Sequence, residues 1–251
     1  MRRSSAALNV QLLALGCITL AAAQVSAQTT APRVYVSVYG GIQTSDNTLA
    51  QSFPVQKNLE DAPIKANVDE NGGTLFDAGA MVRLIGYFGV GFALSVVTHD
   101  ADATVTASIP HPFFFDRLRD IEGTASMSRR ETAAHIQAVF LVPGPRLDVM
   151  VYGGPSLFTL RQTLVTDVTY SESFPFDTAT FTGALTAEAT SKTETGFHIG
   201  GDVAWKFTRN VGVGGMVRYA RAQATLNATN NAPITVDVGG LQFGGGIRLA
   251  F

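Results

Sequence analysis

The sequence predicts an all-β protein, an eight-stranded antiparallel up-and-down transmembrane β-barrel. Three observations support this fold class. The chain has 251 residues, of which only 15% are charged and 25 are glycine; apolar and polar side chains alternate with period two; and the connections between the alternating stretches are long and short in turn. Alternation of this kind produces strands with one apolar and one polar face. Long loops at one end and tight turns at the other are typical of barrels that cross membranes.

The first predicted element is a signal peptide over residues 1–27. Arg2 and Arg3 precede the apolar run "LLALGCITLAAA", and "VSA" before Gln28 has the form of a cleavage site. A basic start, a short apolar run and small residues at the end are typical of exported proteins. Cys17 leaves a lipid-attached terminus as an alternative, although "ALGC" fits an attachment box poorly. We expect export, with the barrel domain in residues 28–251.

Eight alternating stretches follow the signal peptide. In "GFHIGGDVAWKF", for example, Val203 and Trp205 lie opposite Asp202. No stretch after Gln28 reaches the ~18 uninterrupted apolar residues of a membrane helix. The predicted strands cover residues 33–46, 73–87, 89–104, 129–142, 147–164, 189–208, 211–227 and 234–251.

The connections alternate in length along the chain. The first, third, fifth and seventh are long or polar, whereas the second, fourth and sixth are tight turns at Phe88–Gly89, "PGPR" and "TRN". A soluble sandwich has no reason to sort its loops in this way, and a barrel with two different ends does. A hairpin hidden in the first or third long connection would give ten strands, and this alternative stays open.

The polar strand faces carry charges of both signs that can neutralise one another inside a lumen. The opposite faces are mostly apolar, as hydrocarbon requires. Eight strands leave an interior that side chains fill, and buried charges persist when they are paired. We expect a structural network, with a narrow conducting path as the alternative. The predicted lumen residues are Asp77, Arg83, Glu131, Asp148, Asp202, Lys206, Arg218 and Arg248.

The chain closes with "LQFGGGIRLAF", in which every second side chain is apolar. With "YVSVYGGI" and "VMVYGGPSLF", this stretch resembles the small eight-stranded barrels typified by the transmembrane domain of outer-membrane protein A. The resemblance implies that Phe243, Leu249 and Phe251 form an assembly signal for the barrel-assembly machinery. It also implies a location in the bacterial cell outer membrane, with outer-membrane lipid around the barrel. Aromatic residues near the tight turns suit an interfacial girdle.

No residue is predicted to be catalytic or to bind a cofactor or metal. His135 and His198 face the predicted lumen, but no His-x-Ser occurs, which a barrel resembling a lipid A deacylase would use. No two histidines have a metal-ligand spacing along one strand. The orientation of His99 is ambiguous, because it shares a face with Ser95 while Asp100 lies opposite. The net charge of −2 gives no reason to expect nucleic acid as a partner.

The loop "IPHPFFFDRLRD" places Phe113, Phe114 and Phe115 in succession. Exposed rings at a hairpin tip are unfavourable in water, so they either form a contact site for a surface ligand or fold down over the barrel mouth or the lipid rim. The sequence therefore predicts an integral outer-membrane barrel with a non-enzymatic role in envelope structure or surface interaction. A narrow porin-like channel for ions or small solutes and a lipid-modifying enzyme are the alternatives.

Overall fold

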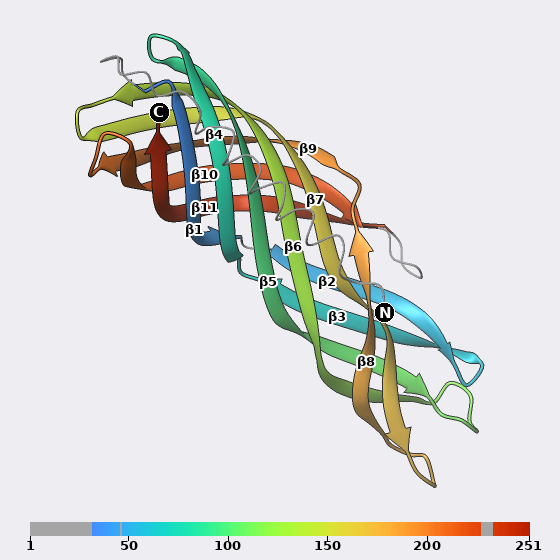
Figure 1. Ribbon diagram of the computed structural model, residues 1–251. Coiled ribbons are helices and arrows are strands. Elements are labelled where there is room, and N and C mark those ends of the chain that lie inside the picture. Colours follow the sequence, from blue (N-terminus) through green and yellow to red (C-terminus); the bar gives the residue numbers. More distant parts are fainter. Residues whose placement is uncertain (1–31, 46, 227–232) are drawn as a thin grey trace, which may run out of the picture.

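Eight strands of the chain close into an antiparallel ring (Figure 1). The computed structural model describes residues 32–45, 47–226 and 233–251, so the predicted signal peptide and Cys17 lie outside the described residues. The strands in this part of the chain are β1 (Val34–Thr44), β2 (Asn47–Lys57), β3 (Glu60–Glu70), β4 (Gly73–Ile85), β5 (Phe88–Pro110), β6 (Leu118–Pro143), β7 (Leu147–Glu172), β8 (Ala179–Thr190), β9 (Glu194–Lys206), β10 (Val211–Leu226) and β11 (Ile234–Ala250). No helix among the described residues is long and apolar enough to cross a membrane.

The ring runs from β1 through β4, β5, β6, β7, β9, β10 and β11, and β11 pairs with β1 to close it. Every one of these pairs is antiparallel, which confirms the predicted fold class and strand number. The short turns and the carboxyl terminus lie at one end of the barrel, here called the turn end. The long connections lie at the opposite end, called the loop end. The first short turn is at Gly86, two residues before its predicted place, with a φ of 58° that favours glycine.

The long connections are strands rather than loops, which corrects the predicted element boundaries. The first connection folds as the hairpin β2–β3, and β3 pairs with β5 through Ile64–Asn67. The third long connection, which is the fifth connection along the chain, contains β8, which pairs with β7, so the predicted strand 189–208 begins only at Glu194. None of these strands enters the ring. The ten-strand alternative is therefore wrong, because the hidden strands extend the barrel wall instead of widening the barrel.

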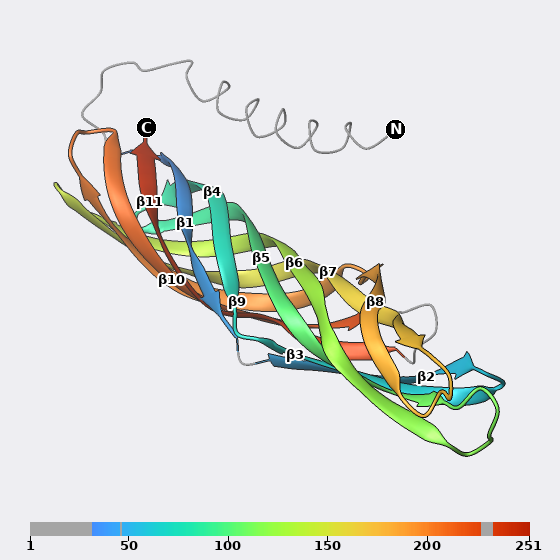
Figure 2. The same cartoon turned by 90° about the horizontal axis from the view of Figure 1, so that it is seen from below.

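Strands β5, β6 and β7 are long enough to cross a membrane and continue well beyond it. They have 23, 26 and 26 residues, whereas about 9–11 tilted residues cross the hydrocarbon layer. In both cartoon views the surplus extends from the ring as an elongated body that ends in three hairpin turns (Figures 1 and 2). These turns connect β2 to β3, β5 to β6 and β7 to β8.

Partway along β5, the apolar residues change from the outward face to the inward face. Near the turn end, Phe92 and its outward neighbours are apolar, and the lumen side carries small residues such as Ser95. Beyond Thr98 the outward residues are polar, whereas Val105 and Ile109 are buried on the inside. The first arrangement suits contact with hydrocarbon and the second suits contact with water. The membrane-spanning part of β5 therefore ends near Thr98.

The loop end has an apolar core of its own. The sheet β2–β3–β5–β6 and the outer parts of the hairpins β7–β8 and β10–β11 enclose it. Phe181 on β8 lies so close to Gly123 on β6 that a Cβ at that position would be 2.0 Å from the ring, so only glycine allows this packing. The core includes Leu49, Phe53, Ile64, Val68, Val105, Ile109, Ile121, Met127, Phe158, Leu160, Leu164, Val168, Leu226 and Val238.

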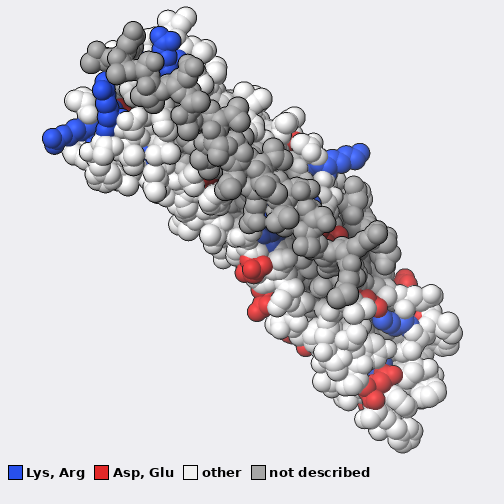
Figure 3. Space-filling model, in the orientation of Figure 1, with Lys and Arg blue, Asp and Glu red and all other residues white. Residues whose placement is uncertain are grey.

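The outer wall of the ring is an apolar belt. Val203, Val217 and Ile247 point outward, while Arg218 and Arg248 are buried inside. A soluble barrel has the reverse arrangement, with its apolar side chains inside. On the face seen in Figure 3, the wall next to the basic turn end is mostly uncharged, and acidic groups begin further toward the loop end. The aromatic residues near the tight turns, which suit an interfacial girdle, are all exposed: Phe88, Phe140, Trp205, Phe207 and Phe251.

Candidate functional site

The lumen contains a connected series of buried polar side chains. Arg218 donates through Nη2 to Asp77 Oδ2 at 2.6 Å and through Nε to Gln242 Oε1 at 2.6 Å. Gln242 donates to Gln43 Oε1 at 2.7 Å, and Gln43 donates to Glu131 Oε2 at 3.0 Å. The series joins five strands, namely β4, β10, β11, β1 and β6. It therefore ties opposite walls of the barrel to one another.

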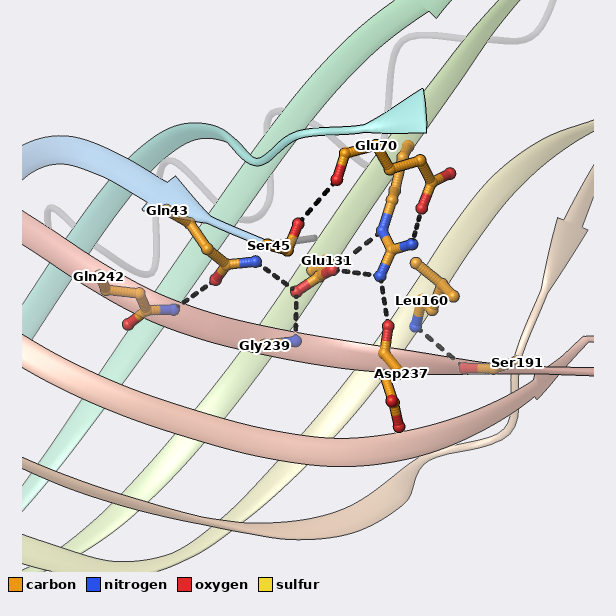
Figure 4. Close-up of polar contacts among 10 residues, drawn as sticks. Gln43, Ser45, Glu70, Glu131, Leu160, Ser191, Asp237, Gly239 and Gln242 are labelled. Atoms are coloured by element: carbon orange, nitrogen blue, oxygen red, sulfur yellow. Dashed lines mark hydrogen bonds and ion pairs between the residues drawn. The ribbon is translucent and has the colours of Figure 1, made fainter. Parts of the chain in front are cut away.

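Arg129 continues this series toward the loop end by contacting Glu131 and Glu70, both labelled in Figure 4. Its Nε donates to Glu131 Oε1 at 2.9 Å, and it forms a second ion pair with Glu70 on β3. Its Nη2 also donates to the backbone oxygen of Asp237 on β11 at 2.8 Å. The backbone N–H of Gly239, where a positive φ of 93° requires glycine, donates to Glu131 Oε2 at 3.0 Å.

Glu70 lies in the hairpin outside the ring, beyond the apolar belt. Burial raises the pKa of its carboxyl above the ordinary value, and the Arg129 guanidinium acts in the opposite direction. The contact with the Arg129 guanidinium therefore favours the ionised form of Glu70, which burial disfavours. Ser45 also donates to the Glu70 backbone oxygen at 3.0 Å, so this contact anchors the end of the β2–β3 hairpin to the barrel mouth.

Two further ion pairs lie nearer the turn end. Arg248 contacts Asp202 and donates to the Tyr39 hydroxyl at 2.8 Å. Lys206 donates to Asp148 Oδ1 at 2.9 Å and to the backbone oxygen of Gly144 in the adjacent turn at 2.7 Å. Each pair joins different strands, and the carboxylates are almost fully buried. All such charges need a partner in a low-dielectric interior.

The predicted lumen residues thus form ion pairs as Arg218–Asp77, Arg248–Asp202 and Lys206–Asp148, and Glu131 pairs with Arg129. Arg83 is half-buried near the turn end, at a distance along the barrel from the Arg129 series. Sequence reasoning missed Arg129 and Glu70. Glu70 was assigned to a loop, and its inward direction follows only from the pairing of β3 with β5.

Four buried side chains form a second hydrogen-bonded series that the sequence prediction did not identify. His135 contacts Ser95 Oγ at 3.0 Å and Ser156 Oγ at 2.8 Å, and Ser156 Oγ contacts His198 Nδ1 at 2.8 Å. The search for His-x-Ser and for paired histidines considered one strand at a time. These residues meet across β5, β6, β7 and β9, and the direct pairing of His135 with Ser156 follows only from the register of β6 and β7 in the structure.

This Ser–His series has no room for a substrate. The interior cavity on its turn-end side is lined by Tyr39, Asp202 and Arg248 among others, and its volume is about 30 Å³, the space of about one water molecule. A second interior cavity beside Glu131 is about 10 Å³. His99 faces inward with Ser95, whereas Asp100 faces outward, so the ambiguity about this strand is resolved.

The three consecutive phenylalanines do not cover the barrel mouth or rest on the lipid rim. Phe113, Phe114 and Phe115 lie in the β5–β6 turn at the tip of the loop end and are 70%, 58% and 72% exposed. The interpretation that they fold down is therefore wrong. Phe174 in the β7–β8 turn and Leu59 in the β2–β3 turn are even more exposed, at 86% and 82%.

The proposed assembly-signal residues lie where the ring closes. Phe243 and Phe251 are exposed on the outer wall. The backbone oxygen of Phe251 accepts hydrogen bonds from Arg33 and Val34, and its N–H donates to the Val34 oxygen at 2.8 Å. Leu249 pairs with Val36 on β1 and Val211 on β10. The last strand, β11, therefore closes the barrel by pairing with the first strand, β1.

No family model matches the chain, and no curated protein matches it. Similar solved structures include Neisserial surface protein A, with 14% identity and a TM-score of 0.42 over 87% of this chain and 97% of that one. Outer membrane protease OmpT from Escherichia coli has 9% identity and a TM-score of 0.45 over 90% and 99%. Ail from Yersinia pestis has 9% identity and a TM-score of 0.38 over 87% and 99%. These likenesses are distant, and the barrel fold rests on the strand pairings above.

Proposed function

We propose that the protein is a bacterial outer-membrane barrel that acts without catalysis, by presenting a folded loop-end body for contact at the cell surface. The observation that carries this proposal is that the apolar residues move from the outward to the inward face along β5, and likewise along β6, from outward Phe140 to inward Ile121. One pair of strands supplies a lipid-facing wall and then, without interruption, a water-facing body with an apolar core. A body of this kind holds its terminal turns in fixed positions, which flexible loops do not.

The apolar loop-end core supports contact over transport. A channel needs a continuous polar path, and the lumen network offers one for part of the length. Val105 on β5 and Leu164 on β7 lie beyond it, fully buried in the apolar core. Because they pack against residues of the other walls, ions would meet an apolar barrier there. A narrow channel remains the second candidate because of the buried network.

Enzymatic activity has one observation in its favour, the contact of His135 with two serines. A nucleophilic serine needs a base and also a place for the substrate. Ser95 and Ser156 are both buried, and the neighbouring cavity holds about one water molecule. We therefore assign this series a structural role, in which the buried hydroxyls and imidazoles serve as hydrogen-bond partners for one another.

Adhesion of whole cells tests the proposal. Cells expressing the chain should adhere to cultured eukaryotic cells, or to one another, several-fold more than cells with an empty vector. The triple variant Phe113→Ser, Phe114→Ser, Phe115→Ser should lose the gain. Leu185→Ser, which removes an exposed apolar side chain from β8 away from the tip, is the matched control and should keep it. Adhesion equal to the vector control would contradict the proposal.

Two assays distinguish the alternatives. In planar bilayers the purified protein should give no steady conductance. A steady conductance that is abolished by Arg218→Gln or Arg248→Gln would favour the channel. Lipid A masses should be the same with and without expression, and a new lipid A species that disappears in His135→Ala would favour the enzyme.

A further inference from the structure

We propose that the tip of the loop end inserts into a second, zwitterionic lipid bilayer, with the exposed phenylalanines as the inserting side chains. This inference rests on the proposed surface-contact function and names its partner. The tip consists of three turns from different hairpins. Its most exposed apolar side chains are Leu59, Phe113, Phe114, Phe115 and Phe174.

Polar contacts hold the three turns together beneath the apolar side chains. Asn58 in the first turn donates to the Pro110 oxygen at 2.9 Å, and the Asp116 N–H donates to Glu60 at 2.9 Å. Arg119 is buried and contacts Glu172 at 2.6 Å in the third hairpin. The apolar surface is therefore displayed by a tied framework rather than by independent loops.

Two backbone N–H groups of the β5–β6 turn are hydrogen-bonded within the turn. The N–H of His111 donates to the Arg117 oxygen at 2.8 Å and closes the turn, and the N–H of Phe113 donates to His111 Nδ1 at 3.1 Å. His111 itself is buried, whereas the three rings that follow it are not. Internal hydrogen bonds of this kind lower the cost of bringing a turn close to hydrocarbon, where water is absent.

The chemistry of the tip favours lipid over a protein partner. The residues that supply most of the binding energy in protein interfaces are enriched in tyrosine, tryptophan and arginine, which combine an apolar body with a polar group, and leucine is under-represented among them. The five most exposed apolar side chains here are phenylalanine and leucine, which have no polar group. Phe113 makes an edge contact with Phe176 in the neighbouring turn, with ring centroids 5.5 Å apart, so rings from separate turns form one apolar surface at a protruding end.

The charge around the tip selects the kind of bilayer. The turns and their flanks carry six carboxylates and three basic side chains. Each basic side chain is already in an ion pair: Arg117 with Asp177, Arg119 with Glu172, and Lys57 with Asp167. An excess of acidic groups repels an anionic surface and leaves a zwitterionic one accessible. The acidic and basic residues are Glu60, Asp61, Asp116, Asp120, Glu172 and Asp177, and Lys57, Arg117 and Arg119; Asp167, which lies further from the turn on β7, adds a seventh carboxylate beside Lys57.

Vesicle co-flotation tests this inference. The full chain is held in nanodiscs, so that its apolar belt is already surrounded by lipid, and is mixed with phosphatidylcholine vesicles. The wild type should float with the vesicles. The triple change of Phe113, Phe114 and Phe115 to Ser should lower the bound fraction at least about tenfold, because three rings lose their transfer into hydrocarbon. Leu185→Ser should bind as the wild type does.

Two further arms sharpen the test. The triple change of the same residues to Leu should keep most of the binding, because lipid selects apolar area, whereas a protein pocket shaped for rings would lose it. Vesicles with a large share of phosphatidylglycerol should bind less than pure phosphatidylcholine. Wild type that does not float, a Ser variant that floats equally well, or stronger binding to anionic vesicles would overturn the inference.

The two proposals can fail separately. If adhesion of cells depends on Phe113, Phe114 and Phe115 while the vesicles bind nothing, surface contact stands and the lipid partner is wrong. If the protein promotes no adhesion but the wild type floats with the vesicles through these rings, the lipid partner stands and the cellular role is wrong. Heat-modifiable migration of each variant on unboiled gels confirms that its barrel is folded before either assay.

Discussion

Arg218 on β10 and Asp77 on β4 form an ion pair across the lumen, with their nitrogen and oxygen 2.6 Å apart and their side chains 1% and 4% exposed. Strands β11 and β1 separate these two strands in the ring. The pair therefore connects walls that share no backbone hydrogen bonds. Gln242 holds the second nitrogen of the guanidinium at 2.6 Å, so the geometry of the pair is fixed from two sides.

Replacing Arg218 by Met should destabilise the barrel by about 3–5 kcal/mol, because Asp77 then remains buried without its cation. The midpoint of urea unfolding in detergent, followed by heat-modifiable migration, measures this. Arg221→Met is the control, since its contact with Asp237 is about half exposed and such pairs contribute at most about 1 kcal/mol. Adding Asp77→Asn to Arg218→Met should recover part of the loss. Equal effects at Arg218 and Arg221 would contradict the structural role of the pair.

Replacing Arg129 by Leu should loosen the β2–β3 hairpin, because Glu70 loses the contact that joins β3 to β6. The loss removes the influence that lowers the pKa of Glu70, so this pKa rises further above its unfolded value of about 4.3. A carboxyl with a raised folded pKa weakens the fold as pH rises through that range. Proteolysis within residues 45–72 should therefore be faster than in the wild type at pH 8, and less so at pH 5. Arg161→Leu, at an exposed contact with Glu188, should have no effect at either pH.

The ring was predictable because hydrocarbon and lumen impose opposite requirements on alternate residues. The inward direction of Asp77, Asp202, Arg218 and Arg248 follows from that parity alone. Their partners do not, because a contact across the barrel depends on the stagger of all the strands between the two residues. Arg248 and Asp202 illustrate this: β10 lies between their strands β11 and β9, and nothing in the local sequence indicates that the two side chains form an ion pair.

The sequence left open a hairpin in the first or third long connection, but the extent of the loop-end body was missed, for a different physical reason. Its strands alternate as those of the ring do, but with the apolar side inward, so a search for lipid-facing strands ended where the outward residues became polar. Val105 and Ile109 continue the inward parity of Ser95, which indicates that the strand does not stop. The hairpin β2–β3 is harder to predict, because Pro54 and Pro63, which face each other in it, are unusual in strands and favour a loop.

The apolar belt ends near Thr98 on β5. An arginine should therefore be costly at an outward position before this boundary and tolerated at one beyond it. Phe92→Arg places a charge on the lipid-facing wall and should cost about 2–4 kcal/mol if that position lies near the midplane. Asp102→Arg lies on the same face beyond the boundary, in water, and should be tolerated. The fraction of folded protein in outer-membrane fractions, scored on unboiled gels, measures both. Comparable losses at the two positions would place the boundary elsewhere.

Removing Phe251 should slow assembly more than it destabilises the finished barrel. Its backbone makes three hydrogen bonds with Arg33 and Val34 at the seam, and its ring lies on the outer wall, where a recognition factor can reach it before the barrel closes. Phe251→Ala keeps the backbone contacts and removes the ring, so it should lower the rate at which folded protein appears in the membrane while leaving the unfolding midpoint within about 1 kcal/mol of the wild type. Phe207→Ala removes another exposed aromatic residue at the turn end and should leave the rate unchanged. Equal rates for the two variants would show that the final ring acts only as part of the girdle.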